Sequence, residues 1–82
     1  MYKRQQEFEL FPNPSSSKIT IRDVNKLNKD ISIINSGGQM LISNLISKLE
    51  LTEIDISSLP SGIYFAIIKS DTKSVVRKIV LD

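Results

Sequence analysis

The chain has 82 residues, a length that predicts one domain, and its 11 basic and 9 acidic side chains leave a formal net charge of +2. This balance gives no indication of a nucleic-acid partner. The absence of cysteine and histidine excludes disulfides, thiolate nucleophiles, Ser-His triads and ordinary zinc sites. We therefore expect a domain that is not an enzyme and that holds no cofactor or metal. The longest apolar runs, such as residues 63–68, are far shorter than the roughly 20 residues that span a bilayer, so we expect no direct membrane insertion.

The first residues begin like the basic part of a signal peptide, but no apolar segment follows them. We interpret residues 1–6 as a leader that is either disordered or derived from a sequencing adapter, and residues 7–82 as the domain. We also expect the chain to be the C-terminal part of a longer protein.

Two alternating segments open the domain. Residues 7–11 alternate polar and apolar side chains, as a half-buried strand does, and residues 18–22 do so again with β-branched residues at their centre. Between them, Pro12-Asn13-Pro14 ends the first strand, because proline cannot donate a hydrogen bond to a sheet. The polar residues 23–30 predict a loop.

A hairpin follows this loop. A strand predicted over residues 31–34 leads into a turn at Gly37 and Gly38, because glycine reaches positive φ without steric cost. The turn requires a partner strand, which we place at residues 39–43.

The segment from residue 41 to residue 49 supports two interpretations. Its apolar side chains recur at helical spacing, and no glycine or proline interrupts them, so the local pattern favours a helix as much as a strand. Short strands at regular spacing elsewhere in the chain favour a strand. We predict a strand over residues 39–43 and leave residues 44–49 open between strand, loop and helix. The residues at helical spacing are Leu41, Ile42, Leu45, Ile46 and Leu49.

Three strands complete the chain. Residues 52–56 alternate, and residues 75–81 form the last apolar segment. Residues 63–69 are apolar on both faces, which predicts a central strand that is covered on both sides. The predicted strands are therefore 7–11, 18–22, 31–34, 39–43, 52–56, 63–69 and 75–81.

The stretch from Asp55 to Tyr64 is the densest signal in the sequence. Asp55 and Ser57 are residues that bond nearby backbone N–H groups and turn the chain, and we expect Leu59 to cap the end of the core. We expect Gly62 to adopt a backbone conformation closed to other residues. Tyr64 opens the central strand, as does the tyrosine of the tyrosine corner in immunoglobulin-like sandwiches, whose hydroxyl bonds back to the upstream backbone. The fold prediction is an all-β, seven-stranded immunoglobulin-like β-sandwich.

Other polar clusters have simple interpretations. Glu7 and Glu9 share one face of a strand, which indicates a solvated edge. Ser15 to Ser17 form a polar loop with no base to activate a hydroxyl. The pair Arg77-Lys78 fits either a solvated outer face or a charge that a partner contacts, and composition does not separate the two.

In this order and spacing, the motifs resemble the type IX secretion C-terminal sorting domain (type A) of Bacteroidota. The resemblance runs from about Phe8 to the end of the chain. One departure is the acidic Asp82, where members of the family often end in lysine. The matching segments are Leu10-Phe11-Pro12-Asn13-Pro14, Lys18 to Ile21, Ile31 to Gln39, Ile54 to Phe65 and Val76 to Val80.

The resemblance implies a secretion signal that directs a cargo protein through the outer-membrane type IX translocon. It implies removal by a sortase-like signal peptidase, attachment of the cargo to the surface, and a route through the periplasm to the cell surface or medium. The expected partners are the translocon, the peptidase and N-terminal cargo domains. The alternative is an adhesive or carbohydrate-binding module of the cell surface. The candidate recognition residues are Val76, Arg77, Lys78, Ile79 and Val80, and the structural motif residues are Pro12, Asn13, Pro14, Gly38, Leu59, Gly62 and Tyr64.

Overall fold

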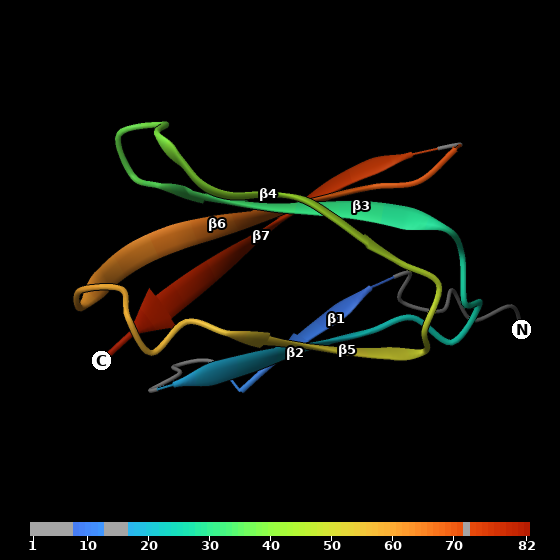
Figure 1. Ribbon diagram of the computed structural model, residues 1–82, viewed down its shortest axis with the longest axis horizontal. Helices are drawn as coiled ribbons and strands as arrows, with labels where there is room; N and C mark the ends of the chain where they lie inside the picture. Colours follow the sequence, from blue (N-terminus) through green and yellow to red (C-terminus); the bar gives the residue numbers. More distant parts are fainter. Residues whose placement is uncertain (1–7, 13–16, 72) are drawn as a thin grey trace, which may run out of the picture.

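The computed structural model describes residues 8–12, 17–71 and 73–82, and within them the chain forms seven β-strands and no helix. Figure 1 shows the strands in two layers that face each other. The predicted all-β, seven-stranded immunoglobulin-like sandwich is confirmed. The strands are β1 (Glu9–Phe11), β2 (Lys18–Arg22), β3 (Lys29–Asn35), β4 (Met40–Ser47), β5 (Leu51–Asp55), β6 (Gly62–Lys69) and β7 (Ser74–Leu81).

The two layers are antiparallel sheets of unequal size. One has three strands in the order β1-β2-β5, and the other has four in the order β4-β3-β6-β7. The chain therefore crosses between sheets in the β2–β3, β4–β5 and β5–β6 connections. Strand alternation sends every second side chain into the space between the sheets. The buried apolar core consists of Phe8, Ile19, Ile21, Ile31, Ile33, Ile54, Ile56, Tyr64, Ala66, Ile68, Ile79 and Leu81.

The ambiguous segment is a strand, which settles residues 44–47 against the helix. β4 pairs with β3, but the register shifts between Ile31 and Ile33 and again between Ile33 and Ile34. At each shift β4 contributes one extra residue, as in a β-bulge, and Asn44 has a positive φ of 59°. The extra residues break the two-residue alternation. The apolar side chains of β4 consequently recur at a spacing that resembles a helix.

The position of β6 is as predicted, but its environment is not. β6 lies between β3 and β7 in the four-stranded sheet, so it is central. One face, with Tyr64, Ala66 and Ile68, is buried in the core. The prediction that both faces are covered was wrong: Ile63 is 44% exposed and Phe65 and Ile67 are only half-buried. The pattern of an apolar strand was correct, but no second layer of the described chain lies on its outer side.

Some predictions fall outside the described residues. These are the leader over residues 1–6 and the side chains of Glu7, Asn13, Pro14, Ser15 and Ser16. Pro12 directly follows β1, as expected of a residue that ends a strand. The predicted loop over residues 23–30 is two residues too long, because β3 begins at Lys29.

Candidate recognition surface

Strand β7 carries the five candidate recognition residues, and its alternation divides them between two environments. Ile79 is fully buried, and its side chain belongs to the core. Val76, Lys78 and Val80 have the opposite parity and therefore face away from the core. The sequence prediction grouped all five, but only these three place side chains on the outer surface.

Arg77 is an inward-directed charge at the side of the sandwich. Its Nε donates a hydrogen bond to the carbonyl of Phe8 at 3.3 Å, and its second nitrogen donates to the carbonyl of Val76 at 3.3 Å. The first bond joins the last strand of the four-stranded sheet to the residue that precedes β1 of the other sheet. Arg77 therefore ties the two layers together beside an open depression that Glu9, Leu10, Phe11 and Arg22 also line.

The outer side of the four-stranded sheet is apolar across neighbouring strands. Phe65 of β6 lies between Ile34 of β3 and Lys78 of β7 in the sheet register, and Ile67 pairs with Val76 in the same way. Directly opposite residues in an antiparallel pair point to the same side of the sheet. These side chains therefore form one surface, here called the apolar face. Its members are Ile34, Met40, Ile46, Ile63, Phe65, Ile67, Val76 and Val80.

The outer side of the three-stranded sheet, here called the charged face, has a different composition. Lys18 forms an ion pair with Glu53 at 3.7 Å, and Arg22 forms one with Glu9 at 3.8 Å. All four side chains are about half exposed or more, so solvent screens both pairs. This is the usual pattern of an antiparallel sheet with one solvated face.

The predicted tyrosine corner is present. Tyr64 is buried, and its hydroxyl donates a hydrogen bond to the carbonyl of Pro60. The N–H of Leu59 donates to the carbonyl of Ile56 at 3.1 Å, and the side chain of Leu59 packs against the core. Gly62 has a φ of +155°, which agrees with the conformation expected of it. These contacts hold the connection by which the chain crosses from β5 to β6.

The two other predicted turn features also have their expected geometry. Gly38 has a φ of +90° in the β3–β4 turn, where Asn35 accepts hydrogen bonds from the backbone N–H groups of Gly37 and Gln39. Asp55 accepts a hydrogen bond from the backbone N–H of Ser57 at 2.9 Å. Hydrogen bonds from the side chain of Ser57, and then from its backbone, hold the pKa of Asp55 below its usual value of 3.8.

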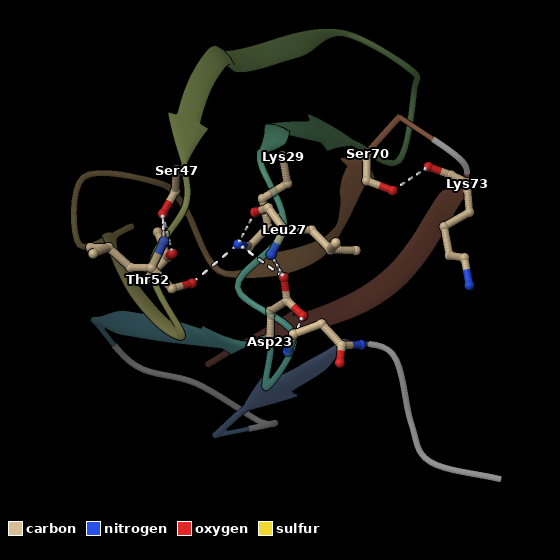
Figure 2. A network of polar contacts seen from close by, with 9 residues as sticks. Asp23, Leu27, Lys29, Ser47, Thr52, Ser70 and Lys73 are labelled. Atoms are coloured by element: carbon tan, nitrogen blue, oxygen red, sulfur yellow. Dashed lines mark hydrogen bonds and ion pairs between the residues drawn. The ribbon is translucent and has the colours of Figure 1, made fainter.

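A buried ion pair lies where the sequence predicted a polar loop. Asp23 and Lys29 are 3.1 Å apart, and both side chains are fully buried (Figure 2). The Lys29 ammonium also donates to the carbonyls of Leu27 at 2.8 Å and Leu49 at 3.1 Å. Each of the three ammonium hydrogens thus has an acceptor, which offsets much of the cost of burying the charge.

The Asp23 carboxylate is equally well supplied with partners. It accepts hydrogen bonds from the backbone N–H groups of Asn25 at 3.1 Å and Leu27 at 2.8 Å. The N–H of Asp23 donates to the carbonyl of Glu50 at 2.7 Å. The ion pair therefore joins the β2–β3 connection to the β4–β5 connection, two of the places where the chain crosses between sheets. Its role is structural, and the predicted polar loop over residues 23–30 gave no indication of the burial.

Residues 8–12, 17–71 and 73–82 contain neither a metal-binding cluster nor a membrane-spanning helix. No group of three or more acidic, histidine or cysteine residues that could hold a metal ion occurs among them. In the same part of the chain, no helix is long and apolar enough to cross a membrane. A glycan-binding module would present exposed aromatic rings, whereas Phe8 and Tyr64 are buried, Phe65 is half-buried and Phe11 is 41% exposed.

The fold and its surfaces define a small all-β sandwich with one charged and one apolar outer face. Comparison with known families agrees with this class: residues 9–82 match the secretion system C-terminal sorting domain, and the chain belongs to that family. It is thus a C-terminal sorting domain of type IX secretion, a signal for export to the cell surface or the extracellular space. No curated protein matches the chain.

Proposed function

We propose that this chain is a type A sorting domain of a Bacteroidota cargo protein, which it directs from the periplasm through the outer-membrane type IX translocon. The observation that carries this proposal is the family match over all seven strands, from β1 to the end of β7. A folded sandwich whose outermost strand β7 exposes side chains to solvent supports it. A signal needs such a surface and no reacting groups.

Recognition within this proposal lies first in β7, the outermost strand in the order β4-β3-β6-β7. Val76, Lys78 and Val80 present two β-branched side chains and one cation on the outer side of this strand. Arg77 and Ile79 support the surface from beneath, because they hold β7 to the core and to Phe8.

The later steps of the pathway follow from the resemblance. The domain is removed from its cargo by a sortase-like signal peptidase once the cargo has crossed the outer membrane. The cargo is then attached to the cell surface or released. The direct partners are accordingly the translocon, the peptidase and the cargo domains that precede this chain.

A reporter fusion tests the proposal. A reporter enzyme that follows a Sec signal peptide is joined to residues 7–82 and produced in a Bacteroidota host with an intact type IX system and in a translocon-deletion strain. We expect the reporter in the medium or on the cell surface of the intact host and in the periplasm of the deletion strain. Equal export from both strains would contradict the proposal. Western blotting for loss of the tail tests its removal separately.

A second comparison addresses the adhesive or carbohydrate-binding alternative. The purified chain is applied to an array of bacterial and host glycans. If the chain is a sorting signal, we expect it to bind no glycan on the array and we expect export of the reporter to depend on the translocon. Glycan binding combined with translocon-independent export would support the alternative function instead.

A further inference from the structure

The apolar face has a composition that the fold does not require. An antiparallel sheet with one face on the core normally carries polar residues on its other face, and the charged face follows this rule. On the four-stranded sheet, by contrast, Val76 is 56% exposed, Met40 is 54% exposed and Ile46 is 59% exposed. The preference of strands for β-branched residues accounts for part of this composition. It does not account for Met40.

The area of the apolar face indicates the type of complex that it forms. Strands about 4.8 Å apart and seven or eight residues long, at about 3.3 Å per residue, give a footprint of roughly 500 Å² for this sheet. Apolar patches of roughly this size on monomeric proteins are often functional. A standard stable interface buries about 800 Å² on each partner. The face is therefore too small for a stable dimer and suits a transient complex.

Charge narrows the choice of partner. Lys78 stands in the same row as Ile34 and Phe65, with Val76 and Val80 on either side of it along β7. At one end of the face, Asp30 lies opposite Lys69. Among its strand-paired positions, the face therefore combines an apolar centre with two cations, Lys69 and Lys78, and one carboxylate, Asp30. A second copy would bring a like charge against the same surface, which disfavours self-association.

We propose that the apolar face is the docking surface for a protein of the secretion machinery. The partner's surface is apolar, with a carboxylate that faces Lys78. This inference rests on the proposed sorting function and extends recognition from β7 to β6 and β3. A transient interface suits a signal that must be bound during export and released afterwards.

Matched substitutions on the two faces test the proposal. Val76→Asp places a carboxylate on the apolar face, and Leu51→Asp places one on the charged face at nearly the same exposure, 56% against 54%. Both positions lie on the outermost strand of their sheet. Thermal unfolding of each 82-residue variant, followed by circular dichroism, establishes that it is folded. Should Val76→Asp be unfolded, Val76→Lys replaces it and is likewise expected to reduce export, because it also places a charge on the apolar face.

The reporter fusion described above provides the readout. We expect Val76→Asp to reduce export by roughly tenfold or more, the effect of losing about 1.4 kcal/mol of binding free energy. Leu51→Asp should leave export within about twofold of the wild type. Lys78→Glu should reduce export more than Lys78→Arg does, because only the first places a negative charge against the partner's carboxylate.

Crosslinking identifies the occupant. A photoreactive amino acid at position 67, at the centre of the apolar face, is compared with one at position 20 on the charged face during export in the intact host. An adduct with a translocon-associated protein from position 67 only would support the inference. Adducts with a second copy, with the reporter or with lipid would overturn it, as would equal adducts from both positions.

The two proposals fail in different ways. If the wild-type fusion is not exported in a translocon-dependent manner, the sorting function itself is wrong. If the wild-type fusion is exported and folded Val76→Asp and Lys78→Glu fusions are exported equally well, sorting stands and the apolar face is not the docking surface.

Discussion

The two outer faces of the sandwich belong to sheets that obey the same pairing rules, yet they differ in chemistry. On the charged face, Lys18 and Glu53 pair across neighbouring strands in contact with water. On the apolar face, the corresponding positions of β6 and β3 hold Phe65 and Ile34. Both sheets bury isoleucines on their inner sides. The difference indicates that packing of the core determines the composition of the inner faces, whereas other requirements determine the composition of the outer faces.

The largest expected effect comes from removing the Lys29 ammonium, which joins the β2–β3 and β4–β5 connections. Lys29→Ala leaves the buried Asp23 carboxylate unpaired and removes the donor to the carbonyl of Leu49. We expect the free energy of unfolding to fall by about 3–5 kcal/mol, measured by urea denaturation followed by circular dichroism. The control is Lys18→Ala, which removes an exposed ion pair on the charged face and should cost at most about 1 kcal/mol. Equal losses would show that the Asp23–Lys29 pair is not a principal support of the fold.

A smaller effect is expected where the chain crosses from one sheet to the other. Tyr64→Phe keeps the buried ring but removes the hydrogen bond to the carbonyl of Pro60. We expect a loss of about 0.5–1.5 kcal/mol in the free energy of unfolding, with an unchanged dependence on urea concentration. Hydrogen exchange at the N–H of Leu59, which bonds to Ile56, should become faster. Unchanged stability and exchange would mean that the hydroxyl does not hold this connection.

The contrast between the faces should also be visible without a partner. Phe65→Thr removes the aromatic ring from the centre of the apolar face, and Leu51→Thr removes an isolated apolar side chain from the charged face. We expect Phe65→Thr to elute clearly earlier from a hydrophobic-interaction column and Leu51→Thr to elute almost unchanged. Both should alter stability by no more than about 1 kcal/mol. A larger shift for Leu51→Thr would show that the contrast has been overestimated.

The smallest expected effect is on the pH dependence of stability, through the ionisation of Asp55. Because the folded pKa of Asp55 lies below 3.8, ionised Asp55 stabilises the fold above that pH, and this contribution disappears as the pH falls through the folded pKa. Asp55→Asn should therefore lower the urea midpoint slightly at pH 7, and the difference from the wild type should shrink below about pH 3.8. Urea titrations at both pH values measure it. A difference that grows in acid would reverse the assigned sign.

Much of the fold could be predicted because its signals are local. Alternation located β2 at its observed bounds and the other strands within a few residues. The turn chemistry between Asp55 and Tyr64 predicted the tyrosine corner, since each of its contacts joins residues close in sequence. The outward position of Val76, Lys78 and Val80 also follows from alternation once β7 is located.

The remaining features depend on contacts between distant segments. Lys29 has the same appearance in the sequence whether it is solvated or buried, and its burial requires the carbonyl of Leu49 from another connection. The bulges of β4 made its strand difficult to predict, because the extra residues change the spacing of the apolar side chains from that of a regular strand. The partial exposure of the outer side of β6 could not be predicted either, since an apolar strand does not reveal whether its second face is covered by its own chain.

Strand β7 also determines when the fold can form. Ile79 and Leu81 complete the core from the last strand, and β6 lacks its neighbour on one side until β7 is present. The pairings of β2 with β5 and of β3 with β6 join distant parts of the chain, which makes folding comparatively slow. A chain emerging from the ribosome therefore cannot complete the sandwich before Leu81 has been added. Only molecules whose translation has reached that point can present the finished surface.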